Sequence, residues 1–438
     1  MANKRKTFFI LLLISCLLVV LCIVAKQYYE QTYIDTMAEE HEKTSQRKAN
    51  DSKSEITLLY SNRNLSWEEA LRKVVNSYMA ENEDVVIHLQ PSSGDSSSDD
   101  LKMRLATDEY PDVFELEEPY EFMIENKLAE IPGELSEKLE NPLSMFEQVF
   151  ALPIYKSTYG VIYNETIFHK SGLEEPQSYE EFLYICEEFA AQGVVPLAVN
   201  TGAEEQVIQL FNYFYQKELA LKNPDWQKER LKGDRSFSDA EMQSVLKNYQ
   251  DFLKREFVQI EPYSLTEVQR IEKLVNNEVA MVFTKPEFFN VISEYDSDFL
   301  FSWFFLPAGD KRVAVDIVDS YWAISDACKK DPAKYSLVID FLSYFYSKEN
   351  YRTVLISMNA MATTKEPVIY PSSEVQQKLI ADYRYAMKSN EYFGNSLTPQ
   401  EFEPKLYDAL LKLLSDSYAA EDLSEKLDVA WNQLLIEG

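Results

Sequence analysis

The chain has 438 residues, of which 46% are hydrophobic and 13% aromatic, so it can bury the cores of two or three globular domains. Its 43 basic and 73 acidic residues give a formal net charge of −30, which argues against nucleic-acid binding because phosphate recognition needs lysine and arginine. Only 10 glycines occur, and neither a GxGxxG nor a GxxxxGK[ST] pattern is present, which disfavours a nucleotide-phosphate site.

The N-terminus joins a basic start to an apolar run. Residues Phe8–Ala25 follow Lys4, Arg5 and Lys6, and as a helix they would span roughly 27 Å, close to the thickness of a bilayer core. We therefore predict an uncleaved signal anchor over residues 1–25, with the folded part outside the cell. The alternative is a signal peptide with a lipid on Cys16, because Leu13-Ile14-Ser15-Cys16 resembles a lipobox.

A polar, charged segment over residues 26–54 has no hydrophobic period and is predicted to be a tether. The folded part begins near Glu55. Its first elements alternate between β-branched strands and amphipathic helices, and the first helix starts with a capping box at Ser66–Glu69. The predicted strands are 56–60, 85–89 and 111–116, and the predicted helices are 66–78 and 101–107.

The central stretch, Ala151–Asn200, has the most clearly marked boundaries. An apolar strand over 159–163 leads into a short helix capped by Asn164 and ended at Gly172. A second helix begins with the capping box Ser178–Glu181, and an apolar strand over 194–199 follows. This strand–helix–strand order predicts a parallel pair of strands joined by a crossover.

The second half continues the alternation and then becomes helical. Leu406, Leu410, Leu413 and Leu414 form one apolar stripe near the C-terminus. Helices are predicted at 207–221, 239–253, 266–276 and 331–345, and apolar segments lie among them at 279–283, 301–306 and 314–325.

Several segments resemble the carbohydrate-type extracellular solute-binding proteins of bacterial ABC importers, the group that includes maltose-binding protein. The resemblance rests on the ordered pattern from Pro153 through Gly160–Asn164 to Pro196, on LKMRLATDEYPDVFEL, and on Asn277–Phe283. It implies an α/β, two-lobed periplasmic-binding-protein-like fold with a central ligand cleft. It also implies a monomer that captures a sugar or oligosaccharide and delivers it to importer permease subunits.

The chain departs from the family pattern at three places. Glu278 replaces a glycine, Asp319 and Ser320 stand where the family has glycines, and Glu287 occupies the place of a ligand-stacking tryptophan. A solute-binding fold used as a sensor or scaffold, with a degenerate pocket, therefore remains an alternative.

Catalytic and metal-binding patterns are missing from the sequence. It has three histidines and four cysteines but no HExxH, GxSxG or CxxC motif, so we expect no enzyme activity, no metal and no cofactor. An exported glycoside hydrolase that uses two of the many carboxylates is the less favoured alternative.

The resemblance also predicts how the chain divides. The first lobe is expected to hold residues 55–158 and about 307–358, and the second 159–306 and about 359–438. Crossings at 157–160 and 305–310 would act as hinges.

Ligands of open α/β sheets sit outside the carboxyl ends of strands, and a sugar needs aromatic faces together with carboxylates or amides. We favour Trp322 as the stacking residue, although Trp322 and Tyr60 border apolar strands and are equally well explained as core. The candidate ligand-binding residues are Tyr60, Ser61, Arg63, Glu117, Tyr120, Ser157, Tyr159, Asn200, Thr201, Glu287, Asp319, Tyr321 and Trp322.

Overall fold

The computed structural model describes most of the chain that follows the predicted tether. The described residues are 53–62, 65–94, 96–107, 109–255, 258–261, 266–370, 373–389, 391–395, 397–399, 401–415 and 417–437. The predicted anchor, nearly all of the tether, and Arg63 lie outside them. Across the described residues, no helix is both long and apolar enough to cross a membrane.

The described chain packs as two compact units of very different size. In the small unit Ser54 lies with residues 84–86, and the Ser54 amide donates to the Asp84 carbonyl at 2.8 Å. The large unit comprises residues 55–83 and 87–438 and contains the second main β-sheet and most of the first.

The first sheet has six strands in the order β2-β1-β3-β15-β5-β4. Strands β1 and β3 are parallel, whereas β15 runs antiparallel to both β3 and β5. The β15 strand therefore returns to this sheet from much later in the chain. Its members are β1 (Ser54–Tyr60), β2 (Val85–Pro91), β3 (Val113–Leu116), β4 (Leu143–Met145), β5 (Gln148–Pro153) and β15 (Tyr321–Ile324).

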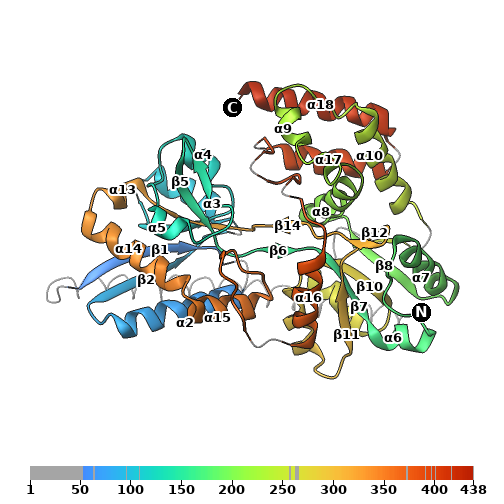
Figure 1. The fold of residues 1–438 in the computed structure, drawn as a ribbon, viewed down its shortest axis with the longest axis horizontal. Coiled ribbons are helices and arrows are strands. Elements are labelled where there is room, and N and C mark those ends of the chain that lie inside the picture. Colours follow the sequence, from blue (N-terminus) through green and yellow to red (C-terminus); the bar gives the residue numbers. More distant parts are fainter. Residues whose placement is uncertain are drawn as a thin grey trace, which may run out of the picture. The chain divides into compact units, whose positions relative to one another are not determined.

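Helices cover both faces of the first sheet (Figure 1). On one face Leu101 of α3 and Phe122 of α4 share a core with Leu59 and Phe114. On the other, Trp67 of α2 packs against Trp322 and Phe345. The helices are α2 (Leu65–Glu81), α3 (Ser97–Leu105), α4 (Tyr120–Ile124), α5 (Gly133–Ser136), α13 (Asp326–Lys329), α14 (Pro332–Phe345) and α15 (Lys348–Met358).

Helix α3 begins four residues earlier than the sequence predicted. The Ser96 hydroxyl accepts a hydrogen bond from the Asp99 amide at 3.2 Å, so Ser96 is the cap. The polar residues between Ser96 and Leu101 hid this start, because they carry no apolar period.

The second sheet has five strands in the order β11-β7-β10-β8-β9. The predicted parallel pair of β7 and β8 is wrong, because β10 lies between them and runs antiparallel to β7 but parallel to β8. Sequence periodicity identifies strands but carries no information on a later strand that inserts between them. The strands are β7 (Gly160–Asn164), β8 (Val195–Asn200), β9 (Val258–Glu261), β10 (Val279–Thr284) and β11 (Phe301–Phe304).

Helices also line both faces of the second sheet. On one face, α6, α7, α8, α10, α17 and α18 enclose a large core in which the Phe402 and Trp431 rings lie 4.8 Å apart. On the other, Trp303 of β11 packs against Phe289 of α12, and α11 and α16 contribute to the same core. The helices are α6 (Glu165–Ser171), α7 (Tyr179–Ala191), α8 (Glu204–Tyr215), α9 (Trp226–Leu231), α10 (Ala240–Leu253), α11 (Glu267–Val275), α12 (Phe288–Tyr295), α16 (Glu374–Tyr385), α17 (Phe402–Leu414) and α18 (Ala420–Glu437).

The predicted helix over 207–221 is interrupted. It is α8 followed by a π-helical turn, η1 (Gln216–Ala220). The caps predicted for α6 and α7 are confirmed, since Asn164 and Ser178 accept hydrogen bonds from the amides of Ile167 and Glu181. The second half of the capping box predicted at Ser178–Glu181 is shifted by one residue, because the Glu181 carboxylate accepts from the Gln177 amide at 2.7 Å.

Two short strands connect the sheets. In the antiparallel pair β6 (Ser157–Thr158) and β14 (Asp316–Ile317), Thr158 lies opposite Asp316. A hairpin of β12 (Pro307–Ala308) and β13 (Lys311–Arg312) precedes β14. Val313 and Val315 belong to the core of the second sheet, so the chain still packs against that sheet directly before β14.

Gly160 begins β7 at a point of close approach. A Cβ at this position would lie 2.3 Å from Cζ2 of Trp303. Replacement by alanine therefore requires the buried indole to move, and we expect it to lower the free energy of unfolding by about 1–3 kcal/mol or more. Denaturant unfolding would measure this, with Gly94→Ala as the control, because a Cβ at Gly94 meets nothing within 4 Å.

Candidate ligand-binding site

Strand direction brings particular loops together at the strand ends. In the first sheet, Tyr321 pairs with Leu116, so the start of β15 lies beside the end of β3. In the second sheet, Gly160 pairs with Thr284, which places Tyr159 beside the residue that follows β10, Lys285. These strand ends are where an open α/β sheet binds its ligand.

Lys285 links elements that are far apart in the sequence. Its Nζ lies 3.1 Å from Oδ1 of Asp319 and 2.5 Å from Oε1 of Glu205. Burial opposes the charge, but the carboxylates of Asp319, Glu205 and Glu287 outweigh it and raise the lysine pKa. The side chain is therefore a fixed ammonium, and two carboxylates already accept from it.

Aromatic side chains lie near these ion pairs. Nζ of Lys285 is 5.7 Å from the centroid of Tyr159, whose ring lies 5.3 Å from that of Phe283. Burial, and then the charge of Asp319, raise the pKa of Tyr321. Burial raises the pKa of Tyr392, and the nearby Tyr321 adds to the effect. Tyrosines beside carboxylates and an ammonium provide the groups that a sugar requires.

A group of carboxylates lies beside these rings. Burial, and then the charges of Glu118, Glu204 and Glu205, raise the pKa of Glu403 to about 7. Glu403 belongs to the first turn of α17, and its carboxylate lies against Gly394. Among the described residues, no group of three or more histidine, cysteine or acidic side chains is arranged to hold a metal ion.

The raised pKa of Glu403 predicts a pH-dependent stability. The Glu403 carboxyl loses its proton near pH 4.5 in the unfolded chain but only near pH 7 in the folded chain. The stability contributed by this group is therefore complete below about pH 4.5 and is lost as pH rises through about 7. Glu403→Gln should therefore raise the free energy of unfolding at pH 8 by about 1–3 kcal/mol, and the gain should vanish near pH 4. Denaturant titrations at both pH values would measure it, and Glu421→Gln, at an exposed position of α18, is the control. A gain that does not depend on pH would contradict the assignment.

Tyr60 and Trp322 lie in the interior of the first sheet. Both are 0% exposed. The Tyr60 hydroxyl lies 3.1 Å from Nη2 of Arg72, and burial raises its pKa to about 12. The Trp322 ring lies 5.8 Å from that of Trp67 and 5.5 Å from that of Phe345. These positions favour the core alternative for both residues, so neither is carried into the proposed site.

Of three further candidates from the first sheet and its loops, Ser61 and Glu117 have hydrogen-bond partners and Tyr120 is exposed. The Ser61 amide donates to Oε2 of Glu115 at 2.9 Å. The Glu117 carboxylate accepts from the amide and hydroxyl of Ser98, at 3.0 and 2.9 Å, at the start of α3. Tyr120 is 51% exposed at the first residue of α4. Of these three, Tyr120 presents the most accessible side chain.

The candidates at the edge of the second sheet are mostly buried. Asn200 is 4% exposed, and its Oδ1 accepts from the Gly202 amide at 2.9 Å. The Thr201 carbonyl accepts from the Tyr407 hydroxyl at 2.8 Å. Ser157 lies within β6, opposite Ile317. Glu287 directly precedes α12, where its charge acts on Lys285.

Four residues of the site were missed by the sequence analysis. Lys285 follows β10 directly, so the strand-end rule already used for its neighbours would have found it. Glu205 lies in the first turn of α8, just beyond β8. Tyr392 and Glu403 come from the C-terminal segment, whose described residues form no strand and therefore offer no strand end from which to predict them.

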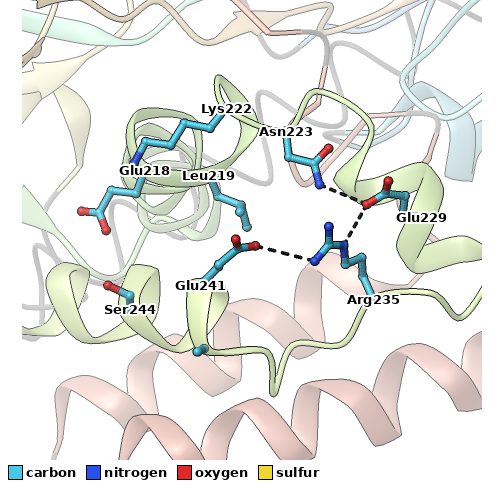
Figure 2. Close-up of a pocket in the computed structure, with 9 residues that line it drawn as sticks. Glu218, Leu219, Lys222, Asn223, Glu229, Arg235, Glu241 and Ser244 are labelled. Carbon is cyan, nitrogen blue, oxygen red and sulfur yellow. Dashed lines mark hydrogen bonds and ion pairs between the residues drawn. The ribbon is translucent and has the colours of Figure 1, made fainter.

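A surface hollow lies elsewhere, among η1, α9 and α10 (Figure 2). Polar side chains in this hollow bond to one another. Oε2 of Glu229 accepts hydrogen bonds from Arg235 at 2.8 Å and from Asn223 at 3.0 Å. None of the residues that line it is aromatic; they are Glu218, Leu219, Lys222, Asn223, Glu229, Arg235, Ala240, Glu241 and Ser244. It therefore lacks the stacking surface of the strand-end site.

Comparison with known families identifies the chain. Residues 64–352 match the model of the bacterial extracellular solute-binding protein family. The chain belongs to this family. Its members are extracellular binding proteins, which agrees with the resemblance seen in the sequence.

Among curated proteins, the solute-binding protein is 26% identical over 162 residues to the multiple sugar-binding protein of Streptococcus mutans. That match covers 35% of this chain and 38% of the relative, so it spans well under half of the relative's length.

Solved structures share the fold. A chitin oligosaccharide binding protein aligns with a TM-score of 0.73 at 17% identity, over 88% of this chain and 100% of that one. A sugar transporter from Bacillus licheniformis in complex with stachyose gives 0.66 at 16% identity, over 87% and 100%. RafE in complex with raffinose gives 0.67 at 18% identity, over 87% and 100%. The predicted α/β, two-lobed solute-binding fold is thereby confirmed.

Proposed function

We propose that this solute-binding protein captures a sugar or oligosaccharide outside the cell and delivers it to the permease subunits of an ABC importer. The observation that carries the proposal is that Lys285, beside the Tyr159 ring, forms ion pairs with Glu205 and Asp319 at strand ends of both sheets, with Tyr321 two residues beyond Asp319. Aromatic faces accept the C–H surfaces of a sugar, and charged groups hydrogen-bond its hydroxyls.

The ligand class has further support from the relatives. The curated relative is a multiple sugar-binding protein, and two of the solved structures hold stachyose and raffinose. The proposed ligand-binding residues are Tyr120, Tyr159, Glu205, Lys285, Glu287, Asp319, Tyr321, Tyr392 and Glu403, with Ser157, Asn200 and Thr201 supporting the loops that carry them.

Binding is proposed to close two lobes around the ligand. The lobes would comprise residues 55–158 with a returning segment, and residues 159–306 with about 359–438. The pairing of β14 with β6 moves the proposed start of the returning segment from residue 307 to about residue 316. Small-angle scattering should show compaction when the ligand is added. Identical scattering curves with and without a bound saccharide would rule out closure.

The N-terminal run, residues 8–25, is proposed to anchor the protein to the cell membrane, either as an uncleaved helix or through a lipid on Cys16. Mass spectrometry of the native protein distinguishes the two. Peptides that contain Lys4–Lys6 support the helix, and a mature chain that begins at lipidated Cys16 supports the lipid.

The binding function is tested by thermal shift with raffinose, stachyose and chitin oligosaccharides, combined with chromatography of each mixture after incubation. We expect at least one saccharide to raise the melting temperature and to be recovered intact. Conversion of the saccharide would favour the hydrolase alternative. No shift with any saccharide would favour a sensor or scaffold with a degenerate pocket.

A further inference from the structure

The charged groups of the strand-end site are unequal in sign. Lys285 supplies an ammonium, whose Nζ lies 3.1 Å from Oδ1 of Asp319 and 2.5 Å from Oε1 of Glu205. The carboxylate of Glu287 acts on the same lysine. Because one ammonium cannot neutralise all of these carboxylates, this part of the site keeps a net negative charge.

The carboxylate of Glu403 reaches the site from α17. Tyr407, one turn further along this helix, donates a hydrogen bond to the Thr201 carbonyl at 2.8 Å, so the helix begins beside the end of β8. Glu403 lies close enough to Glu205 for that charge to act on it. Among the described residues, no hydrogen bond or ion pair engages the Glu403 carboxylate, so nothing within them neutralises its charge.

The first sheet contributes a further carboxylate. Glu118 lies two residues beyond the end of β3, and its charge acts on Glu403 of α17. Lys102 acts on Glu118 in turn, but Nζ of Lys102 lies 2.6 Å from Oε2 of Glu121 and is paired there. Strand ends of both sheets therefore present carboxylates in excess of ammonium groups.

The position of the site does not depend on these carboxylates. It is proposed from the strand ends, from the Tyr159 ring that lies 5.7 Å from Nζ of Lys285, and from the family of binding proteins that residues 64–352 match. The carboxylates bear on a different property, namely which saccharide the site accepts. A cleft lined by one sign of charge concentrates ligands of the opposite sign and disfavours ligands of the same sign.

We propose that the strand-end site selects saccharides that carry a protonated amino group, such as oligomers of glucosamine, and that the Glu403 carboxylate receives this ammonium. The inference rests on the proposed saccharide-binding function and names the ligand class within it. A neutral saccharide leaves the excess of negative charge in place when it binds, and an anionic saccharide adds to it. A protonated amino sugar offsets one carboxylate and donates N–H groups to it.

The electrostatic environment of Glu403 agrees with this role. Burial, and then the charges of Glu118, Glu204 and Glu205, raise its pKa to about 7. A ligand ammonium beside the carboxylate would favour its charged form and relieve the repulsion among these neighbours. Lys285 does not take this place, since it is already held by Glu205 and Asp319.

The ligand class is tested by calorimetry at pH 7 with two matched trisaccharides, the β-1,4-linked trimers of glucosamine and of glucose. Their rings differ only at C2, where one carries an amino group and the other a hydroxyl group. We expect the full-length protein to bind the glucosamine trimer about 10- to 100-fold more tightly, the equivalent of one hydrogen bond to a charged group. Added salt should reduce this preference, because it screens the attraction between opposite charges.

Glu403→Gln tests the carboxylate that receives the ammonium. It should reduce the ratio of the two affinities by about tenfold, because glutamine keeps the shape of the side chain but removes its charge. Glu118→Gln should reduce the ratio as well, which keeps the test decisive if Glu403→Gln fails to fold. Glu421→Gln, at an exposed position of α18, is the charge-matched control and should leave the ratio unchanged.

Equal or tighter binding of the glucose trimer would overturn the ligand class while leaving the proposed saccharide-binding function in place. Binding of raffinose without binding of the glucosamine trimer would have the same meaning. An unchanged ratio in both Glu403→Gln and Glu118→Gln would overturn the role of these carboxylates. Binding of no saccharide, cationic or neutral, by the wild type would instead count against the proposed function, and this inference would fall with it.

Discussion

Replacing Trp322 by alanine is expected to lower the free energy of unfolding by about 3–5 kcal/mol, the cost of emptying a fully buried aromatic site. The ring is 0% exposed, and it lies between Trp67 of α2 and Phe345 of α14. The cavity would therefore open between the first sheet and the helices that cover it. Denaturant unfolding measures the loss directly.

Tyr385→Ala is the matched control for Trp322→Ala, because Tyr385 is an aromatic residue that is 83% exposed. It should change the free energy of unfolding by less than about 0.5 kcal/mol. If Trp322→Ala kept its stability but no longer bound a saccharide, the indole would belong to the ligand site after all.

The second large effect is expected from Lys285→Met. This change leaves the Asp319 carboxylate, whose side chain is 10% exposed, without the ammonium that now lies 3.1 Å away. Removing one partner of a buried ion pair costs about 3–5 kcal/mol. We also expect saccharide affinity to fall by roughly 10- to 100-fold, the equivalent of one hydrogen bond to a charged group.

A double variant separates the two effects of Lys285→Met. Adding Asp319→Asn removes the unpaired charge, so stability should largely recover while saccharide affinity remains low. Recovery of both would show that Lys285 acts on binding only through stability. Unchanged stability in the single variant would contradict a buried ion pair.

Local signals in the sequence predicted much of the fold. Asn164 and Ser178 mark helix starts because their side chains satisfy amides that the helix leaves without partners, which is a strictly local effect. The neighbours of β7 were not predictable in this way. Its partners β10 and β11 come from residues more than 100 positions later, and pairing between such distant strands leaves no trace in local periodicity.

The candidate site was only partly predictable, because local signals mark the ends of strands but not the distant segments that meet there. The strand-end rule identified Tyr159, Asp319 and Tyr321 because all three lie within two residues of the end of a strand. It did not distinguish Tyr321 from its neighbour Trp322, although adjacent strand residues face opposite sides of a sheet. Glu403 enters the site from α17, and only tertiary packing brings that helix to the strand ends.

The most direct test of the account is a crystal structure of the protein with the saccharide that gives the largest thermal shift. We predict density for the saccharide at the strand ends, in contact with Tyr159 or Tyr321 and within hydrogen-bonding distance of Lys285, Asp319 or Glu205. A saccharide bound in the hollow among η1, α9 and α10, with the strand ends empty, would contradict it.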